Sequence, residues 1–160
     1  MRRQFAVCLV VMCAAGAATA QEDDGLVIDK FQFTWTVVEV GRTQFLIEKD
    51  AKATTAGLRH GAGSISMSLE DAQAVGRALA RTDEFAEKLK DTKDRIETIE
   101  AGKIHVDFKT TDSGEFRVQV TPEKWMRVFA TLKPTEARAL AGPMKKAIHA
   151  GALVDRKIKL

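Results

Sequence analysis

Hydrophobic and polar residues alternate along the first part of this chain in the manner of β-strands. Aromatic and β-branched residues occupy every second position over Phe31–Val37, and Gly41 separates them from a second apolar run over Thr43–Glu48. A period of two in residues of this kind predicts two strands paired as an antiparallel hairpin. The side chains expected on its core-facing side are those of Phe33, Trp35, Val37, Phe45 and Ile47.

A loop, a short strand and a helix are predicted to follow. The small and polar residues of Lys52–Gly63 show no period and indicate a loop, whereas Ser64–Ser68 alternates like a strand with its apolar residues inward. Ser68 with Asp71 three residues later is a helix N-cap pattern. Gly76 weakens this helix by about 1 kcal/mol relative to alanine, or else permits close packing on a sheet. The predicted buried face comprises Val75, Ala78, Leu79, Phe85, Ala86 and Leu89.

The second half opens with an ambiguous segment and continues with three predicted strands. Arg95–Glu100 fits either a helix or a strand. Alternation over Ile104–Lys109 and Phe116–Thr121, on either side of an Asp112–Gly114 turn, predicts a hairpin. A third strand is predicted over Met126–Leu132.

A helix is predicted to close the second half. Pro134 suits the first helical position, where an N–H would have no partner within the helix. Pro143 is expected to kink or split the helix. Gly151 is expected to end it, ahead of a basic tail of alternating character over Val154–Leu160. The predicted buried stripe comprises Ala137, Leu140, Met144, Ala147 and Ile148.

The two halves share the order of hairpin, further strand and helix, which indicates an internal duplication. The best-matched stretches, Ile65–Val75 and Ala130–Leu140, both place an acid, Ala-x-Ala and an aliphatic residue at one spacing. Chance similarity between two alanine-rich helix starts is the alternative. The predicted fold is α+β, an antiparallel sheet with two helices packed on one side. Its two β-β-β-α units, each with room for a fourth strand, span residues 26–94 and 95–160.

The first twenty residues have the order of a secretory signal peptide. Two arginines precede an apolar run over Phe5–Ala18, and Ala18–Ala20 is a small-x-small cleavage site. Cleavage after Ala20 leaves an acidic stretch, residues 21–25, that is expected to be disordered. The predicted location is therefore the periplasm or the medium.

Two other export routes are open. The start Arg2-Arg3-Gln4-Phe5 contains the twin-arginine pair and a following aromatic residue, but it lacks the usual Ser or Thr before and Lys after. Cys13 as a lipoprotein anchor would need a small residue where Met12 stands. Ordinary secretion is favoured.

Removal of the signal changes the charge and the cysteine content. Without Arg2 and Arg3, the 25 basic residues fall to 23 against 22 acidic ones, a net charge of +1. This balance gives no general electrostatic reason to bind nucleic acid or an anionic membrane. Cys8 and Cys13 both lie in the signal, so the mature chain can form no disulfide, thiolate metal site or cysteine nucleophile.

The strands around Val106–Lys109 and Phe116–Val118, with the two strand-to-helix junctions, resemble the Pur-alpha and Whirly group of single-stranded nucleic-acid binders. The resemblance implies the topology of that group and no binding residue. The export signal and the charge are departures from it.

No constellation typical of catalysis or metal binding stands out. His60, His105 and His149 are far apart and lack His or Cys partners at metal-ligand spacing. The glycine-rich segment Arg59–Ser64 lacks the Lys-Ser/Thr ending of a phosphate-binding loop and precedes a strand, which indicates a connector. We therefore predict no catalytic residue, metal site or cofactor.

The outer face of the second hairpin is polar and is predicted to pair opposite charges across its strands rather than to bind a ligand. Its residues are His105, Asp107, Lys109, Arg117 and Gln119.

The strand predicted over Met126–Leu132 supplies the best candidate for a binding surface. Trp125, Arg127 and Phe129 alternate away from its apolar residues and lie on the sheet face that no helix covers, unless a second sheet buries them. Trp35, by contrast, is expected in the core. The predicted function is a non-enzymatic exported binding or structural protein for a protein, peptide or envelope component. Single-stranded nucleic-acid binding by the sheet face is the alternative, and a small hydrolase or metal enzyme is the third.

Overall fold

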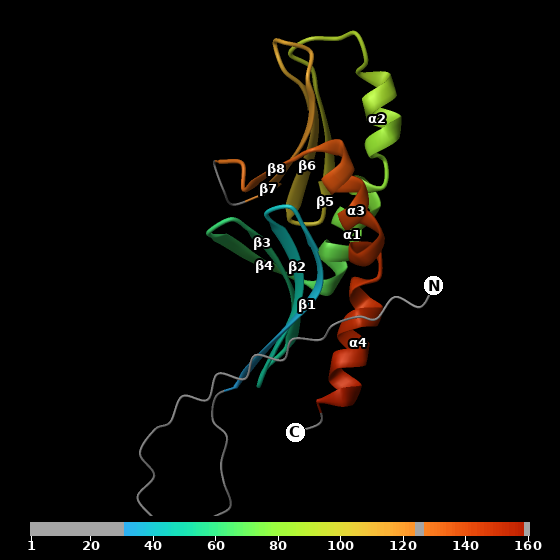
Figure 1. The fold of residues 1–160 in the computed structure, drawn as a ribbon. Coiled ribbons are helices and arrows are strands. Elements are labelled where there is room, and N and C mark those ends of the chain that lie inside the picture. Colours follow the sequence, from blue (N-terminus) through green and yellow to red (C-terminus); the bar gives the residue numbers. More distant parts are fainter. Residues whose placement is uncertain (1–30, 124–126, 159–160) are drawn as a thin grey trace, which may run out of the picture.

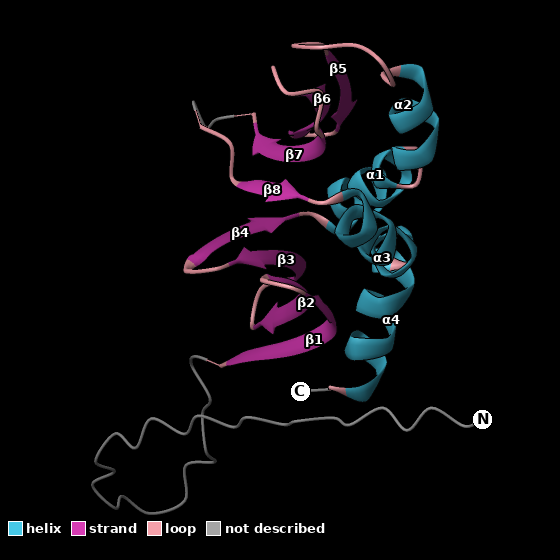
Figure 2. Cartoon of the chain, turned by 45° about the horizontal axis from the view of Figure 1, so that its top comes forward, coloured by secondary structure: helices cyan, strands magenta, loops and turns pink. Residues whose placement is uncertain are grey.

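The computed structural model of the chain describes residues 31–123 and 127–158. Within these ranges it contains two antiparallel four-stranded sheets and four helices, which confirms the α+β class. We expected one sheet with two helices; instead, all four helices lie on one side of two sheets (Figures 1 and 2). No described helix is long and apolar enough to cross a bilayer. The predicted signal peptide and acidic stretch, residues 1–25, lie outside the described residues.

The elements follow the chain as four strands, two helices, four strands and two helices. The first sheet contains, in spatial order, β1 (Gln32–Val40), β2 (Thr43–Asp50), β3 (Thr54–His60) and β4 (Gly63–Met67). The second sheet contains β5 (Ile96–Ala101), β6 (Ile104–Thr110), β7 (Phe116–Pro122) and β8 (Ala130–Leu132). The helices are α1 (Leu69–Leu79), α2 (Thr82–Lys88), α3 (Pro134–Lys145) and α4 (Ala147–Lys157).

The first hairpin forms as predicted, with one irregularity. Trp35 stands opposite Ile47 in the antiparallel register of β1 and β2. The register then shifts between Thr36 and Val38, so that Val38 stands opposite Phe45, and Val37 and Val38 both pack against the core. An extra residue on one strand reverses the alternation beyond it. A pattern of period two cannot reveal such a shift when both neighbouring residues are valine.

The loop predicted over Lys52–Gly63 is wrong, because β3 occupies most of it. β3 pairs with β2 on one side and with β4 on the other. This central position buries consecutive residues, among them Ala56 and Gly57, so no alternation is visible in the sequence. The Glu48 carboxyl carbon lies 3.2 Å from where a Cβ of Gly57 would be, so Glu48 covers the outer side of the strand.

In the second sheet, the ambiguous segment is a strand, and the third predicted strand is shorter than expected. The ambiguous segment Arg95–Glu100 forms β5, and the expected hairpin forms from β6 and β7. The third strand is only β8, Ala130–Leu132. Val128 precedes it with 42% of its surface exposed, and Met126 lies outside the described residues. The prediction of a strand over Met126–Leu132 is therefore right only at its end.

The first helical segment begins as predicted and ends earlier. The Ser68 hydroxyl accepts a hydrogen bond of 3.0 Å from the Asp71 N–H, which caps α1. The apolar residues Phe85 and Leu89 were expected to extend the same helix. The chain instead turns at residues 80–81, and Phe85 belongs to the separate helix α2.

The last helical segment is split, one of the two expected outcomes, but the break lies at Lys146, three residues beyond Pro143, which is inside α3. α3 begins at Pro134 and ends at Lys145, and α4 begins two residues later. Gly151 does not end the helix, and the predicted alternating tail is helical as far as Lys157. Gly151 is buried in α4 because the Leu69 side chain of α1 packs on it, with one methyl carbon 3.2 Å from where a Cβ would be.

Each half contributes a helix to the other half's sheet. α1 follows the first sheet in the chain but packs against β5 and β6, and α4 follows the second sheet but packs against β2 and β3. α1 and α3 pack against each other in the helical layer (Figure 2). The buried apolar side chains of both halves therefore form one cluster. The duplication stays a prediction, and four strands followed by helices in each half is the order it requires.

Each half also places an acidic side chain on the first turn of the other half's sheet. Asp71 in α1 lies against Gly102 in the β5–β6 turn, with its carboxyl carbon 2.8 Å from where a Cβ would be. Glu136 in α3 lies in the same way against Gly41 in the β1–β2 turn. Asp71 Oδ1 also accepts a hydrogen bond of 3.4 Å from the Lys103 N–H. These contacts tie each helix start to the opposite sheet.

Replacing Gly102 with alanine is expected to cost about 1–2 kcal/mol from the backbone alone, because its φ of +66° is unfavourable for a residue with a Cβ. The added methyl also displaces the Asp71 carboxylate, so the total loss is larger. Gly114→Ala is the matched control, since Gly114 has a φ of +82° and open space around it. Urea unfolding should show the larger loss for Gly102→Ala. Equal losses would contradict a contribution from Asp71.

Candidate functional site

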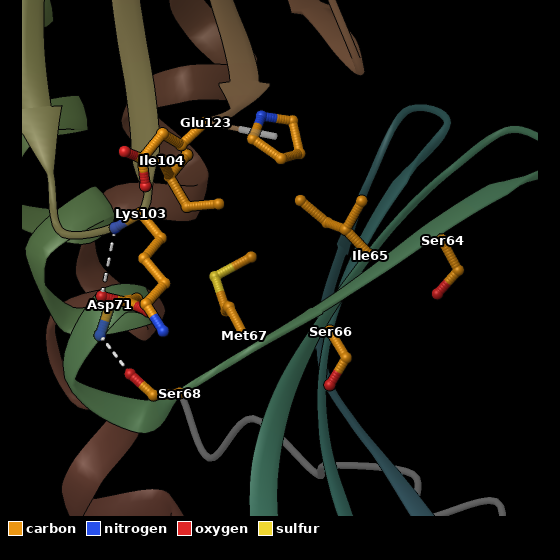
Figure 3. A pocket seen from close by; sticks show the side chains of 10 residues that line it. Ser64, Ile65, Ser66, Met67, Ser68, Asp71, Lys103, Ile104 and Glu123 are labelled. Carbon is orange, nitrogen blue, oxygen red and sulfur yellow. Dashed lines mark hydrogen bonds between the residues drawn. The ribbon is translucent and has the colours of Figure 1, made fainter. Parts of the chain in front are cut away.

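A groove opens between the two sheets beside β4 (Figure 3). Its volume is about 510 Å³, within the range of pockets that hold small ligands or a few side chains. The groove is bordered by β4, the start of α1, the β5–β6 turn and the end of β7. Its apolar floor comprises Ile65, Met67, Ile104 and Pro122.

Along one edge of β4, the backbone N–H and C=O groups are paired with no other strand among the described residues, since β4 pairs only with β3. His60 and Gly63 flank the two-residue turn and form the hydrogen-bonded closing pair, and hydrogen-bonded pairs recur at every second residue from there. The N–H and C=O of Ile65 therefore point toward β3, whereas those of Ser64 and Ser66 point away from it. Both serines border the groove.

The side chains of β4 separate cleanly between the two faces. Figure 3 shows Ile65 and Met67 pointing into the groove and Ser64 and Ser66 pointing away from it. Ile65 and Met67 are each 6% exposed, and both serines are exposed. The strand therefore presents apolar side chains on one face, hydroxyls on the other, and unpaired backbone between them.

The other three edge strands of the described sheets carry features that discourage pairing with another chain. β1 has the register shift between Thr36 and Val38. β5 carries Glu97 and Glu100, and β8 is only three residues long. β4 has five residues with no charge, proline or bulge. It is the edge best suited to accept a further strand.

The rim of the groove is polar and carries both charges. Asp71 is held in place by the Lys103 N–H, and its own N–H is bound by the Ser68 hydroxyl. The Glu123 N–H donates to the Lys103 carbonyl at 2.8 Å, which fastens the end of β7 to the β5–β6 turn. Lys103 and Glu123 are exposed. One cation and two carboxylates thus stand beside the apolar floor.

The predicted surface of Trp125, Arg127 and Phe129 is only partly described. Trp125 lies outside the described residues, and Arg127 is exposed. Phe129 is half-buried against the core, with its ring centroid 6.4 Å from that of His60 and one ring carbon 3.1 Å from where a Cβ of Gly63 would be. The described part of this surface therefore borders the first residue of β4, next to the groove.

Trp35 is half-buried and packs against the core cluster, at the margin rather than in the centre. The Lys157 Nζ of α4 lies 5.7 Å from its ring centroid. The expectation of an inward-facing indole is consistent with this position.

The structure gives the three histidines separate surroundings. His60 Nδ1 lies 2.8 Å from the Thr43 hydroxyl. His105 is half-buried in β6, and His149 is exposed on α4. Among the described residues, no group of three or more His, Cys, Asp or Glu side chains gathers as a metal site would require. The segment Arg59–Ser64 joins β3 to β4, and only residues 61 and 62 lie outside those strands.

The expected pairing of opposite charges across the second hairpin is wrong. Lys109 stands opposite Arg117, and Asp107 stands opposite Gln119. Arg117 instead forms a salt bridge of 2.6 Å with Glu115 on its own side of the hairpin. Asp107 accepts a hydrogen bond of 2.6 Å from the Thr98 hydroxyl of β5. The register, which depends on the turn, decided these partners.

Sequence reasoning missed the groove, although it identified β4 and the α1 cap that border it. The absence of charge and proline in Gly63–Met67 was a visible signal of an unprotected edge. That this strand lies at an edge followed only from recognising β3. Comparison with protein-family models and with curated protein sequences finds no match for this chain.

Proposed function

We propose that this chain is an exported, non-enzymatic binding protein that holds an extended segment of a partner polypeptide along the free edge of β4. The observation that supports this most is the unprotected edge itself, placed beside a groove of about 510 Å³. Addition of a strand to an exposed sheet edge is a common mode of peptide recognition. The proposed site needs no metal or cofactor.

The proposed pairing uses the backbone of Ser64 and Ser66. Each offers one N–H and one C=O at the free edge, and each hydrogen bond contributes about 0.5–1.5 kcal/mol net. A bound strand would place alternate side chains beside Ile65 and Met67, above the apolar floor. The intervening side chains would lie beside the two serines. The preferred ligand is therefore an extended peptide that alternates apolar and polar residues.

The proposed location outside the cytoplasm rests on the signal pattern of residues 1–20. A periplasmic or secreted location gives access to extended segments of other exported chains and of envelope proteins. Amino-terminal sequencing of the accumulated protein checks this part, with Gln21 expected as the first residue.

The nucleic-acid alternative has less support. Binding of single strands by a sheet face relies on exposed aromatic rings for base stacking. The outer face of β6 and β7 instead carries polar residues, among them Asp107, Lys109 and Gln119. Retention of oligonucleotides at low salt, with a steep loss as salt rises, would favour that alternative.

Ser66→Pro is expected to reduce peptide binding at least tenfold while the protein stays folded. Proline removes the N–H that points away from β3, so the ladder between β3 and β4 is kept and the outer edge loses a donor. Fluorescence anisotropy with a labelled seven-residue peptide of alternating valine and threonine, flanked by lysines for solubility, measures the change.

Ser66→Ala is the matched control, because it removes the exposed hydroxyl and keeps the backbone N–H. It should bind the peptide as the unmodified protein does. A second control is the same peptide with alternate backbone nitrogens methylated, which cannot pair along its length. Equal binding of the methylated peptide, or full binding by a folded Ser66→Pro protein, would rule out pairing at this edge.

A further inference from the structure

The end of α3 and the length of α4 carry basic side chains on the outer surface of the helical layer. Lys145, Lys146 and Arg156 are exposed, and the first turn of α4 contains no acid. Figures 1 and 2 show α4 in the helical layer, on the other side of the molecule from the open faces of the sheets. The whole sequence has a net charge of only +3, so this surface is a local concentration of positive charge.

The single acid of α4 does not offset this charge. Asp155 forms a salt bridge of 2.6 Å with Lys49 of β2 and accepts a hydrogen bond of 2.5 Å from the Thr54 hydroxyl. These hydrogen bonds, that from Lys49 first, lower the pKa of Asp155 and keep it ionised and engaged with the first sheet. By contrast, Arg138 elsewhere in the helical layer is paired with Asp83 at 3.1 Å.

Two exposed aliphatic side chains lie among these cations. Ile148 is 40% exposed and Leu153 is 39% exposed, which is unusual for large apolar residues in the described part of the chain. Leu153 follows His149 by four positions, the spacing of neighbours on one helix face. The inner face of α4, with Val154 and Gly151, is buried. α4 is therefore amphipathic, yet its outer surface mixes apolar and basic groups.

We propose that this basic face, defined as Lys145, Lys146, Ile148, Leu153 and Arg156, binds the anionic headgroup surface of a lipid bilayer. The cations match the phosphates in charge, and the two aliphatic side chains enter the boundary between headgroups and acyl chains. The phosphates of a nucleic acid would pair with the cations but would offer no apolar region to Ile148 and Leu153. A bilayer offers both phosphates and an apolar region, so it is the occupant favoured here. The site is separate from the β4 groove and does not rest on the proposed function.

The test measures co-sedimentation of the protein, as purified from the producing cell, with lipid vesicles. One vesicle type contains phosphatidylcholine alone, and the other contains one third phosphatidylglycerol. We expect binding to the anionic vesicles and little to the neutral ones. Each basic residue near an anionic surface strengthens partitioning about fivefold, so Lys146→Gln with Arg156→Gln should weaken binding about 25-fold.

The matched control is Lys93→Gln with Arg95→Gln, which removes the same charge from exposed positions before β5. It should retain most of the binding to anionic vesicles. Ile148→Ser with Leu153→Ser should make the remaining binding more sensitive to salt. Thermal unfolding of each variant verifies that it is folded.

Three results would overturn the proposal. Equal loss in the two double charge variants would mean that net charge alone governs the attraction. No sedimentation with anionic vesicles at low salt would remove the bilayer as occupant. Tighter, salt-sensitive binding of a single-stranded oligonucleotide, lost in the Lys146 and Arg156 variant, would assign the face to nucleic acid instead.

Discussion

Replacing Phe108 with alanine is expected to lower the free energy of unfolding by about 3–5 kcal/mol. Phe108 is fully buried in β6, and its ring stacks on that of Phe85 in α2 with 4.3 Å between centroids. It also lies 6.4 Å from the ring of Phe116 in β7. Truncation therefore leaves a cavity where α2 meets the second sheet and removes an aromatic pair. Urea unfolding followed by circular dichroism measures the loss.

Phe116→Ala is the comparison for this prediction. Phe116 lies on the same face of the second hairpin but is only half-buried, so its truncation leaves a site that water can partly fill. The loss should be clearly smaller than for Phe108→Ala. A loss below about 1.5 kcal/mol for Phe108→Ala would contradict the close packing of its ring, since values this small are typical of methyl deletions.

Gly76→Ala is expected to destabilise the protein by about 1–3 kcal/mol, although alanine is the better helix former. Gly76 is buried in α1 against the end of α3. A Cβ there would stand 2.7 Å from the Met144 carbonyl carbon and closer still to the Lys145 nitrogen. These are backbone atoms, so the two helices must separate. The sequence leaves close packing on a sheet open for this glycine, but its close partner is the helix α3.

Gly151→Ala separates this effect from general crowding. Gly151 is also a buried helical glycine, but the nearest atoms to an added Cβ belong to the end of the Leu69 side chain, which can rotate away. The gain in helix propensity should then offset most of the strain, leaving a change of less than about 1 kcal/mol. The measurement is urea unfolding of both variants. A rise in stability for Gly76→Ala would show that α1 and α3 do not pack closely.

The hairpins could be predicted because their signals are local. In β6 and β7, apolar residues stand at every second position on both sides of a turn that contains Gly114, and the structure keeps that alternation in its burial. The α1 start was visible for a similar reason, since the Ser68 cap bonds a residue only three positions away. The register shift between Thr36 and Val38 had no such local signal, because two valines stand side by side there.

The candidate groove could not be predicted in the same way, because four elements from both halves build it. Ser66 in β4, Asp71 in α1, Lys103 between β5 and β6, and Glu123 after β7 are up to 57 positions apart and meet only in the folded chain. The predicted loop over Lys52–Gly63 also concealed β3, and with it the position of β4 at an edge.

By itself, the sequence determined which side of most strands faces the core and where α1 and α3 begin. Only the tertiary structure decided that there are two sheets, that α1 covers the second sheet and α4 the first, and that β4 lies open beside a groove. The physical reason is the range of the interactions. Alternation and capping depend on residues a few positions apart, whereas apolar burial rewards any partner of suitable shape, wherever it lies in the chain.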